Sequence, residues 1–201
     1  MVAKRAPKNS GLYMTVEQYL ALDESSDAKY EYADGYAYLL RPPSSGYDNH
    51  QPLDLAGGSP AHAALENRLG ALLDNALVDS PCIVYGSDAR LKLDERHYRY
   101  ADVVVACSEQ NEPMLTNPVV VIEVLSPSTE KDDRGEKFEE YKRLQSVKEY
   151  VLVGSQSKLI VVYRRENSWR PYHYQEGNMV ELTSIGVSFP YDRVYRGIRL
   201  G

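Results

Sequence analysis

Residues Val119 to Lys137 read VVVIEVLSPSTEKDDRGEK. The first half is aliphatic and mostly β-branched, which is typical of a strand buried on both faces of a sheet. Glu123 stands in the middle of this strand, although burial of an unpaired carboxylate is costly. We therefore expect a compensating charge near Glu123. The dense run of charges directly after the strand is the first place to look for it.

The sequence around this strand predicts an α/β fold. Thr15 is a suitable cap for a short helix, Asp34-Gly35 predicts a hairpin turn, and Ser59 with Pro60 predicts the start of a long helix. Further strands are expected at residues 82–93, 99–107, 117–125, 149–155, 158–165 and 169–175, and a helix at 130–145. This order of elements indicates a mixed central sheet flanked by helices on both faces.

The length of 201 residues suits a single domain, residues 1–201. We expect a disordered start at 1–11 and a mobile loop at the Pro-, Gly- and Ser-rich residues 41–58. No stretch is apolar enough to span a bilayer, and the basic start lacks the apolar core of a signal peptide. Cys82 and Cys107 lie in apolar runs, so we expect buried free thiols and a cytoplasmic location.

Two carboxylates, Asp102 and Glu123, can meet if their strands are neighbours. The 20 residues between them, 103–122, are enough for one strand, a loop and most of the next strand. Oxygen ligands of this kind suit Mg²⁺ or Mn²⁺, which can activate water for attack on a phosphodiester. The net charge of −6 argues against a bulk nucleic-acid binder, but not against an enzyme with a local basic groove.

Each candidate also has a structural interpretation. Asp102, at a strand start, is at a common position for a turn or cap residue. Glu123 can pair with an arginine such as Arg90 or Arg134. Lys137 has helical spacing with two apolar residues that follow it, so it borders the inward face of its helix. Although helix lysines are usually solvated, a lysine there can reach the carboxylates and stabilise a phosphate or a nucleophilic water.

The motif EVLSPST followed by DRGEK resembles the Uma-two family of endonucleases. The segments YADVVV, KYEYADG and SPAH extend this resemblance over residues 14–163. Because that family belongs to the restriction-endonuclease-like, PD-(D/E)XK superfamily, the resemblance implies a restriction-endonuclease-like core and a metal-dependent nuclease site. The family's acidic residues fall on Asp102 and Glu123, and the carbonyl of Val124 corresponds to a main-chain metal ligand. Glu31 matches an early glutamate that binds the metal or orients a water.

Two positions depart from the superfamily's pattern. Ala101 stands where proline is usual, and Leu125 stands where the lysine two residues after the glutamate is expected. Family members resemble variants in which the lysine has moved to the next helix, which implies Lys137 here. Glu31 can instead be an exposed hairpin carboxylate. His62 matches a position that opens the long helix, but a lone histidine there is typical of helix-end hydrogen bonding, so we leave it out of the catalytic set.

These observations leave three functions open. The first is a Mg²⁺- or Mn²⁺-dependent endonuclease that hydrolyses DNA phosphodiester bonds. The second is a catalytically silent nuclease fold that acts as an interaction or DNA-recognition module, which Leu125 and the acidic net charge favour. The third is a metal-free hydrolase that uses Asp102 and Glu123 as an acid/base pair on another substrate.

Two further regions bear on partners. The basic residues that can form a DNA groove, or simply solvated strand faces, are Arg90, Lys92, Arg96, Arg99, Arg164, Arg165 and Arg170. Near the end of the chain, residues 189–200 are rich in aromatic and apolar side chains. Because nucleases of this superfamily commonly cut as dimers, we expect this tail to form a homodimer contact, with packing on its own domain as the alternative.

Overall fold

The computed structural model describes residues 11–41, 59–108 and 113–200. The chain divides into two compact units, the first containing residues 1–57 and 92–99 and the second residues 58–91 and 100–201. The predicted disordered start, 1–11, and mobile loop, 41–58, lie almost wholly outside the described residues. Within the described ranges, no helix combines the length and the apolar composition needed to cross a membrane.

The first unit is built on a five-stranded sheet with strand order β1-β3-β2-β6-β5, accompanied by one helix. Its elements are β1 (Leu12–Tyr13), α1 (Val16–Ser25), β2 (Lys29–Ala33), β3 (Tyr36–Arg41), β5 (Arg90–Asp94) and β6 (His97–Tyr100). The predicted capping residue is confirmed, because Thr15 forms a capping box with Gln18. The predicted hairpin is confirmed as well, with positive φ at Asp34 and Gly35 between β2 and β3.

The second unit is built on a six-stranded sheet with strand order β11-β10-β9-β8-β7-β4. Its helices are α2 (Pro60–Leu77), α3 (Glu130–Arg134), α4 (Glu136–Arg143) and α5 (Tyr191–Tyr195). The strands of this sheet are β4 (Ile83–Gly86), β7 (Val103–Ala106), β8 (Pro118–Leu125), β9 (Glu149–Gly154), β10 (Ile160–Arg164) and β11 (Pro171–Tyr174). A separate hairpin joins β12 (Met179–Leu182) to β13 (Val187–Pro190). The predicted mixed α/β fold is confirmed.

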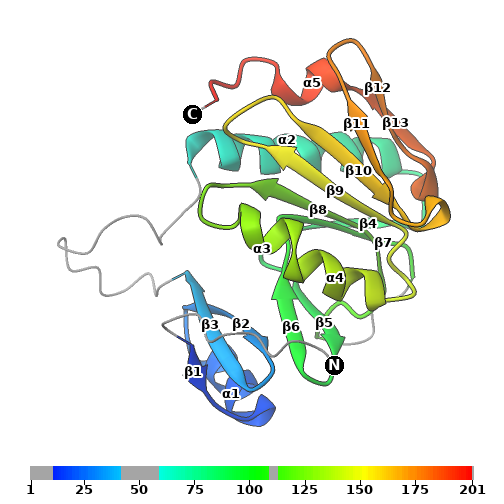
Figure 1. The fold of residues 1–201 in the computed structure, drawn as a ribbon. Helices are drawn as coiled ribbons and strands as arrows, with labels where there is room; N and C mark the ends of the chain where they lie inside the picture. Colours follow the sequence, from blue (N-terminus) through cyan, green and yellow to red (C-terminus); the bar gives the residue numbers. More distant parts are fainter. Residues whose placement is uncertain (1–10, 42–58, 109–112, 201) are drawn as a thin grey trace. The chain divides into compact units, whose positions relative to one another are not determined.

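The pair β8 and β9 is parallel, while the other pairs of this sheet are antiparallel. A parallel pair needs a crossover connection, and α3 and α4 supply it. Figure 1 shows these two helices on one face of the sheet and α2 on the other. Gly135 separates α3 from α4. The residue is a glycine because a Cβ at this position would lie 2.9 Å from the carbonyl oxygen of Lys131. The predicted single helix at 130–145 is therefore two short ones.

The main core lies on the α2 side of the sheet. Leu65, Leu69 and Leu73 of α2 are fully buried, as the helical spacing predicts. They belong to the same cluster as Ile122 and Val124 of β8. Because side chains alternate along a strand, Glu123 points to the other face, toward α4. The register of β8 thus decides which helix meets the carboxylate.

The C-terminal tail is part of this core, so the expectation that it forms a dimer contact is wrong. Phe189, Tyr191, Val194 and Tyr195 are all at most 5% exposed and belong to the core cluster. The hydroxyl of Tyr195 also donates to the carbonyl oxygen of Leu159 at 2.7 Å. These side chains already have partners within their own unit. The homodimer stays a prediction, without support from this segment.

The expectation of free thiols is also wrong, because Cys82 and Cys107 form a disulfide. The antiparallel pairing of β4 with β7 places Ile83 opposite Ala106. The two cysteines follow directly beyond this pair and therefore face each other. The single strands expected at 82–93 and 99–107 are each divided into two strands of different sheets, and the adjacency of β4 and β7 was not predicted. The inference of a cytoplasmic location from reduced cysteines loses its basis.

The disulfide predicts that the unfolded, unreduced chain takes up no alkylating reagent, whereas the reduced chain takes up two labels, as mass spectrometry will measure. Closing a loop with a sequence separation of 25 residues contributes about 3 kcal/mol in the chain-entropy account, so reduction should lower the melting temperature. Cys82→Ser is the control, since reductant should not change its melting temperature. Two labels on the air-oxidised, unreduced protein would contradict the pairing.

Candidate functional site

The buried carboxylate of Glu123 is paired with Lys137. The ammonium Nζ of Lys137, in α4, lies 3.3 Å from Oε1 of Glu123, in β8. Both residues are buried, at 9% and 3% exposure. The hydroxyl of Tyr141 donates to the same carboxylate oxygen at 3.4 Å. Lys137 and Tyr141 are four residues apart on α4, so the predicted inward face of this helix meets Glu123.

A second carboxylate, Asp133, shares the same lysine. Its Oδ1 lies 3.5 Å from Nζ of Lys137, and its side chain is 2% exposed. Lys137 also donates to the main-chain oxygen of Tyr100 at 3.3 Å. Sequence reasoning missed Asp133, although its i,i+4 spacing to Lys137 was a usable signal. One buried ammonium therefore compensates two buried carboxylates and is held by groups from α3 and β8 and by Tyr100, all within the second unit.

Asp102 lies just before β7, beside the strand that carries Glu123. Its Oδ2 accepts a hydrogen bond of 2.6 Å from the main-chain nitrogen of Val124. The β7–β8 ladder ends at Val103 and Ile122, so the Asp102 side chain satisfies an N–H group beyond the last pair. This contact fits the structural interpretation of Asp102 as a cap residue. It also places the carboxylate next to the residue whose carbonyl the resemblance assigns to the metal.

The same carboxylate contacts α2. Nε2 of His62 lies 3.4 Å from Oδ2 of Asp102, and the two side chains are 15% and 18% exposed. Burial lowers the pKa of His62, but the hydrogen bond and charge of Asp102, the charge of Glu66 and a hydrogen bond with the main chain of Val124 raise it, and the net change is upward. His62, Glu66 and Asp102 each offer one ligand atom, and these atoms lie within 4.8 Å of one another. Sequence reasoning set His62 aside and missed Glu66.

Glu31 lies in the first unit, in β2. It is buried, contrary to its interpretation as an exposed hairpin carboxylate. Its Oε2 accepts a hydrogen bond of 3.0 Å from Nη1 of Arg99, which is 1% exposed. The two charges are therefore compensated within that unit. The role of Glu31 as a metal ligand or water-orienting group stays a prediction.

Several arginines named as partners or as groove walls bind groups of the chain itself. Arg134 pairs with Glu130 at 2.7 Å, so the proposed Glu123–Arg134 pair is replaced by the one with Lys137. Arg96 pairs with Asp34 at 2.8 Å. In the second unit, Arg164 pairs with Glu149 at 2.9 Å. Arg165 donates to the main-chain oxygens of Lys142, Leu144 and Val147. Much of the predicted basic surface is thus neutralised or used in packing.

The fold is that of a nuclease-like α/β protein. A solved structure from Anabaena variabilis, described as a "putative nuclease belonging to DUF820", matches with a TM-score of 0.67 and 16% identity over 90% of this chain and 97% of that chain. Two uncharacterised proteins of Synechocystis sp. are 34% and 29% identical, over 92% and 70% of this chain and 93% and 74% of their own lengths. The family model of Uma2, described as "Putative restriction endonuclease", matches residues 16–190. The chain belongs to the Uma2 family.

The shared lysine predicts a clear stability effect. In metal-free protein kept in EDTA, Lys137→Met leaves the buried carboxylates of Glu123 and Asp133 without their ammonium, so the free energy of unfolding should fall by about 3–5 kcal/mol. Urea denaturation measures this loss. Lys142→Met, on the same helix but in an ion pair with Glu139, should cost less than about 1 kcal/mol.

Adding Glu123→Gln to Lys137→Met removes one of the two carboxylate charges that the ammonium of Lys137 compensates in the unmodified chain. The double variant should therefore recover part of the lost stability. If Lys137→Met is as stable as the unmodified chain, the ion pair does not compensate Glu123.

Proposed function

We propose that this chain is a metal-dependent endonuclease that hydrolyses DNA phosphodiester bonds with Mg²⁺ or Mn²⁺ as cofactor. The observation that carries the proposal is the buried pair of Glu123 and Lys137. The usual lysine position is occupied by the uncharged Leu125, yet the ammonium of Lys137, in α4, reaches the glutamate. Membership in Uma2 adds support, because the family is described as "Putative restriction endonuclease".

The donor set fits a hard divalent cation. Asp102 and Glu123 offer carboxylate oxygens, and Val124 offers a main-chain oxygen, which are the ligands that Mg²⁺ and Mn²⁺ prefer. Asp102 is hydrogen-bonded to the nitrogen of Val124, the residue after Glu123, so the donors belong to adjacent points of the same sheet. A bound divalent cation supplies positive charge to the phosphate and makes a water easier to deprotonate.

The protein's own groups have separate tasks in this proposal. The carboxylates of Asp102 and Glu123 would hold the cation, and Glu123 would accept a proton from the attacking water. Lys137 would donate a hydrogen bond to a non-bridging phosphate oxygen, where negative charge develops as water attacks phosphorus. The P–O bond to one sugar oxygen breaks in the same step, and that oxygen leaves and takes a proton from solvent. Asp133 would help to hold the ammonium near this position, because its Oδ1 contacts the same Nζ. Asp133 is thus a positioning residue.

DNA is the partner that this chemistry implies. A homodimer remains part of the proposal through the family resemblance, and a cytoplasmic location remains an expectation. Neither the C-terminal tail, which is buried in its own unit, nor the cysteines, which form a disulfide, support them.

A catalytically silent interaction or DNA-recognition module is the second candidate. The internal pairing of the charged groups favours it, since Lys137, Glu123, Asp133 and Asp102 all have partners within the chain. In this case the ion pair is a structural element, and binding of DNA requires no cation.

Relaxation of supercoiled plasmid in the presence of Mn²⁺ or Mg²⁺ tests the proposal. The unmodified chain should cleave, EDTA should stop cleavage, and Asp102→Asn or Glu123→Gln should each slow it by about 10²–10³-fold. Glu139→Gln is the matched control, because it removes an exposed carboxylate from α4 and should cleave normally.

Two results would refute the nuclease. One is a folded chain that cleaves no DNA with either cation. The other is Glu123→Gln cleaving as fast as the unmodified chain. Binding of the plasmid with a steep salt dependence, without cleavage, would assign the silent DNA-recognition role instead.

A further inference from the structure

The N-terminal half of α2 brings metal-binding side chains to Asp102. Ser59 caps this helix and Pro60 takes its first position, which fixes where the helical turns fall. His62 and Glu66 are four residues apart and therefore lie one above the other on the same face. Their neighbours Ala61 and Leu65 are buried in the core. The helix thus directs an imidazole and a carboxylate away from the core and toward the edge where β7 begins.

The separations of these groups suit a shared ion. The ligand atoms of His62, Glu66 and Asp102 lie within 4.8 Å of one another, and His62 Nε2 and Asp102 Oδ2 are 3.4 Å apart. Two atoms bound to one ion at about 2.1 Å each are at most about 4.2 Å apart, so small side-chain rotations bring all three into range. Glu123 lies outside this group.

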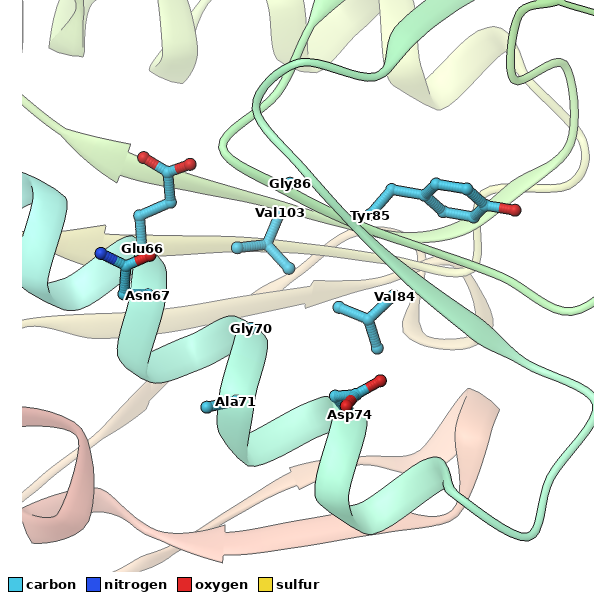
Figure 2. Close-up of a pocket in the computed structure, with 9 residues that line it drawn as sticks. All are labelled: Glu66, Asn67, Gly70, Ala71, Asp74, Val84, Tyr85, Gly86 and Val103. Atoms are coloured by element: carbon cyan, nitrogen blue, oxygen red, sulfur yellow. The ribbon is translucent and has the colours of Figure 1, made fainter.

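A groove of about 280 Å³ runs along α2 from this cluster. Figure 2 shows Glu66 and Asp74 of α2 at its two ends, with Val84 of β4 and Val103 between the helix and the strands. Gly70 lies along the same wall, where a Cβ would meet no atom within 4 Å. A cation at Glu66 would therefore be open to water and to a ligand in the groove. This access distinguishes the cluster from a structural ion pair that is closed to solvent.

We propose that His62, Glu66 and Asp102 bind a divalent transition-metal ion, such as Mn²⁺, in preference to Mg²⁺. The imidazole nitrogen is the reason for the preference, since Mg²⁺ favours all-oxygen, water-rich shells whereas transition metals accept nitrogen. This proposal rests in part on the proposed function, because Asp102 is a ligand in both the nuclease site and the site on α2. It differs in its ligands, which come from α2 and exclude Glu123.

Pulsed EPR of Mn²⁺ bound to the full chain tests this site without any activity. An imidazole nitrogen on the ion gives a nitrogen modulation in the spectrum, and titration of that signal gives the affinity. The unmodified chain should show the signal, and excess Mg²⁺ should displace it poorly. His62→Gln should abolish the signal, and Glu66→Gln should weaken the affinity by about tenfold or more.

Three matched variants serve as controls. Asp74→Asn removes the same charge as Glu66→Gln from the same helix, about 12 Å away along its axis. It should change the affinity by less than about twofold, because this distance exceeds the screening length. His173→Gln, which changes an exposed histidine on β11, should keep the nitrogen signal. Glu123→Gln removes a ligand of the cation in the proposed nuclease site, but it should keep the nitrogen signal, because that signal comes from the imidazole of His62.

The outcomes separate the two proposals. If His62→Gln and Glu66→Gln are folded by circular dichroism and bind Mn²⁺ as the unmodified chain does, this site is refuted, whatever the plasmid assay shows. If Mn²⁺ is lost in Glu123→Gln and kept in His62→Gln, the ion belongs to Glu123 alone, and the nuclease proposal stands without the α2 ligands. Loss of the nitrogen signal only in His62→Gln, in a chain that cleaves no DNA, would support the metal site and refute the nuclease.

Discussion

The ion pair between Glu123 and Lys137 is the interaction on which the second unit depends. A carboxylate in the middle of a buried strand needs a cation within reach, and the cation must come from a different element. The parallel pairing of β8 with β9 requires a crossover, and α3 and α4, which form it, bring Lys137 over Glu123. The same crossover that the chain topology requires therefore also supplies the cation that the buried carboxylate needs. Asp133 and Tyr141 complete the surroundings of the pair.

Much of the fold was predictable because its signals are local. The cap at Thr15, the turn at Asp34-Gly35 and the start of α2 at Ser59 and Pro60 each depend on a few adjacent residues, and all three are confirmed. The failures concern contacts between distant segments. The sequence predicted strands around the two cysteines but not the pairing of β4 with β7, which brings the cysteines together. It identified the aromatic tail but not the surface on which it packs.

In the site, too, the features that depend on local sequence were predictable and those that depend on distant contacts were not. The burial of Glu123, the position of Asp102 at a strand start and the inward spacing of Lys137 are visible along the chain, and the family resemblance added Val124. The convergence of His62 and Glu66 with Asp102 is not visible, because it depends on how α2 packs against the start of β7. A lone histidine at a helix start is ordinary. It becomes chemically informative only when two carboxylates from different elements approach it.

The central claim is that Asp102 holds a divalent cation in a nuclease-like site. The most direct measurement is an anomalous difference map from crystals grown in Mn²⁺, recorded at an energy where manganese scatters anomalously. Our account predicts a peak at about 2.2 Å from a carboxylate oxygen of Asp102. The crystals must be well ordered, and the Mn²⁺ concentration must be one that saturates the protein in solution. The absence of a peak at Asp102 under these conditions would contradict the claim.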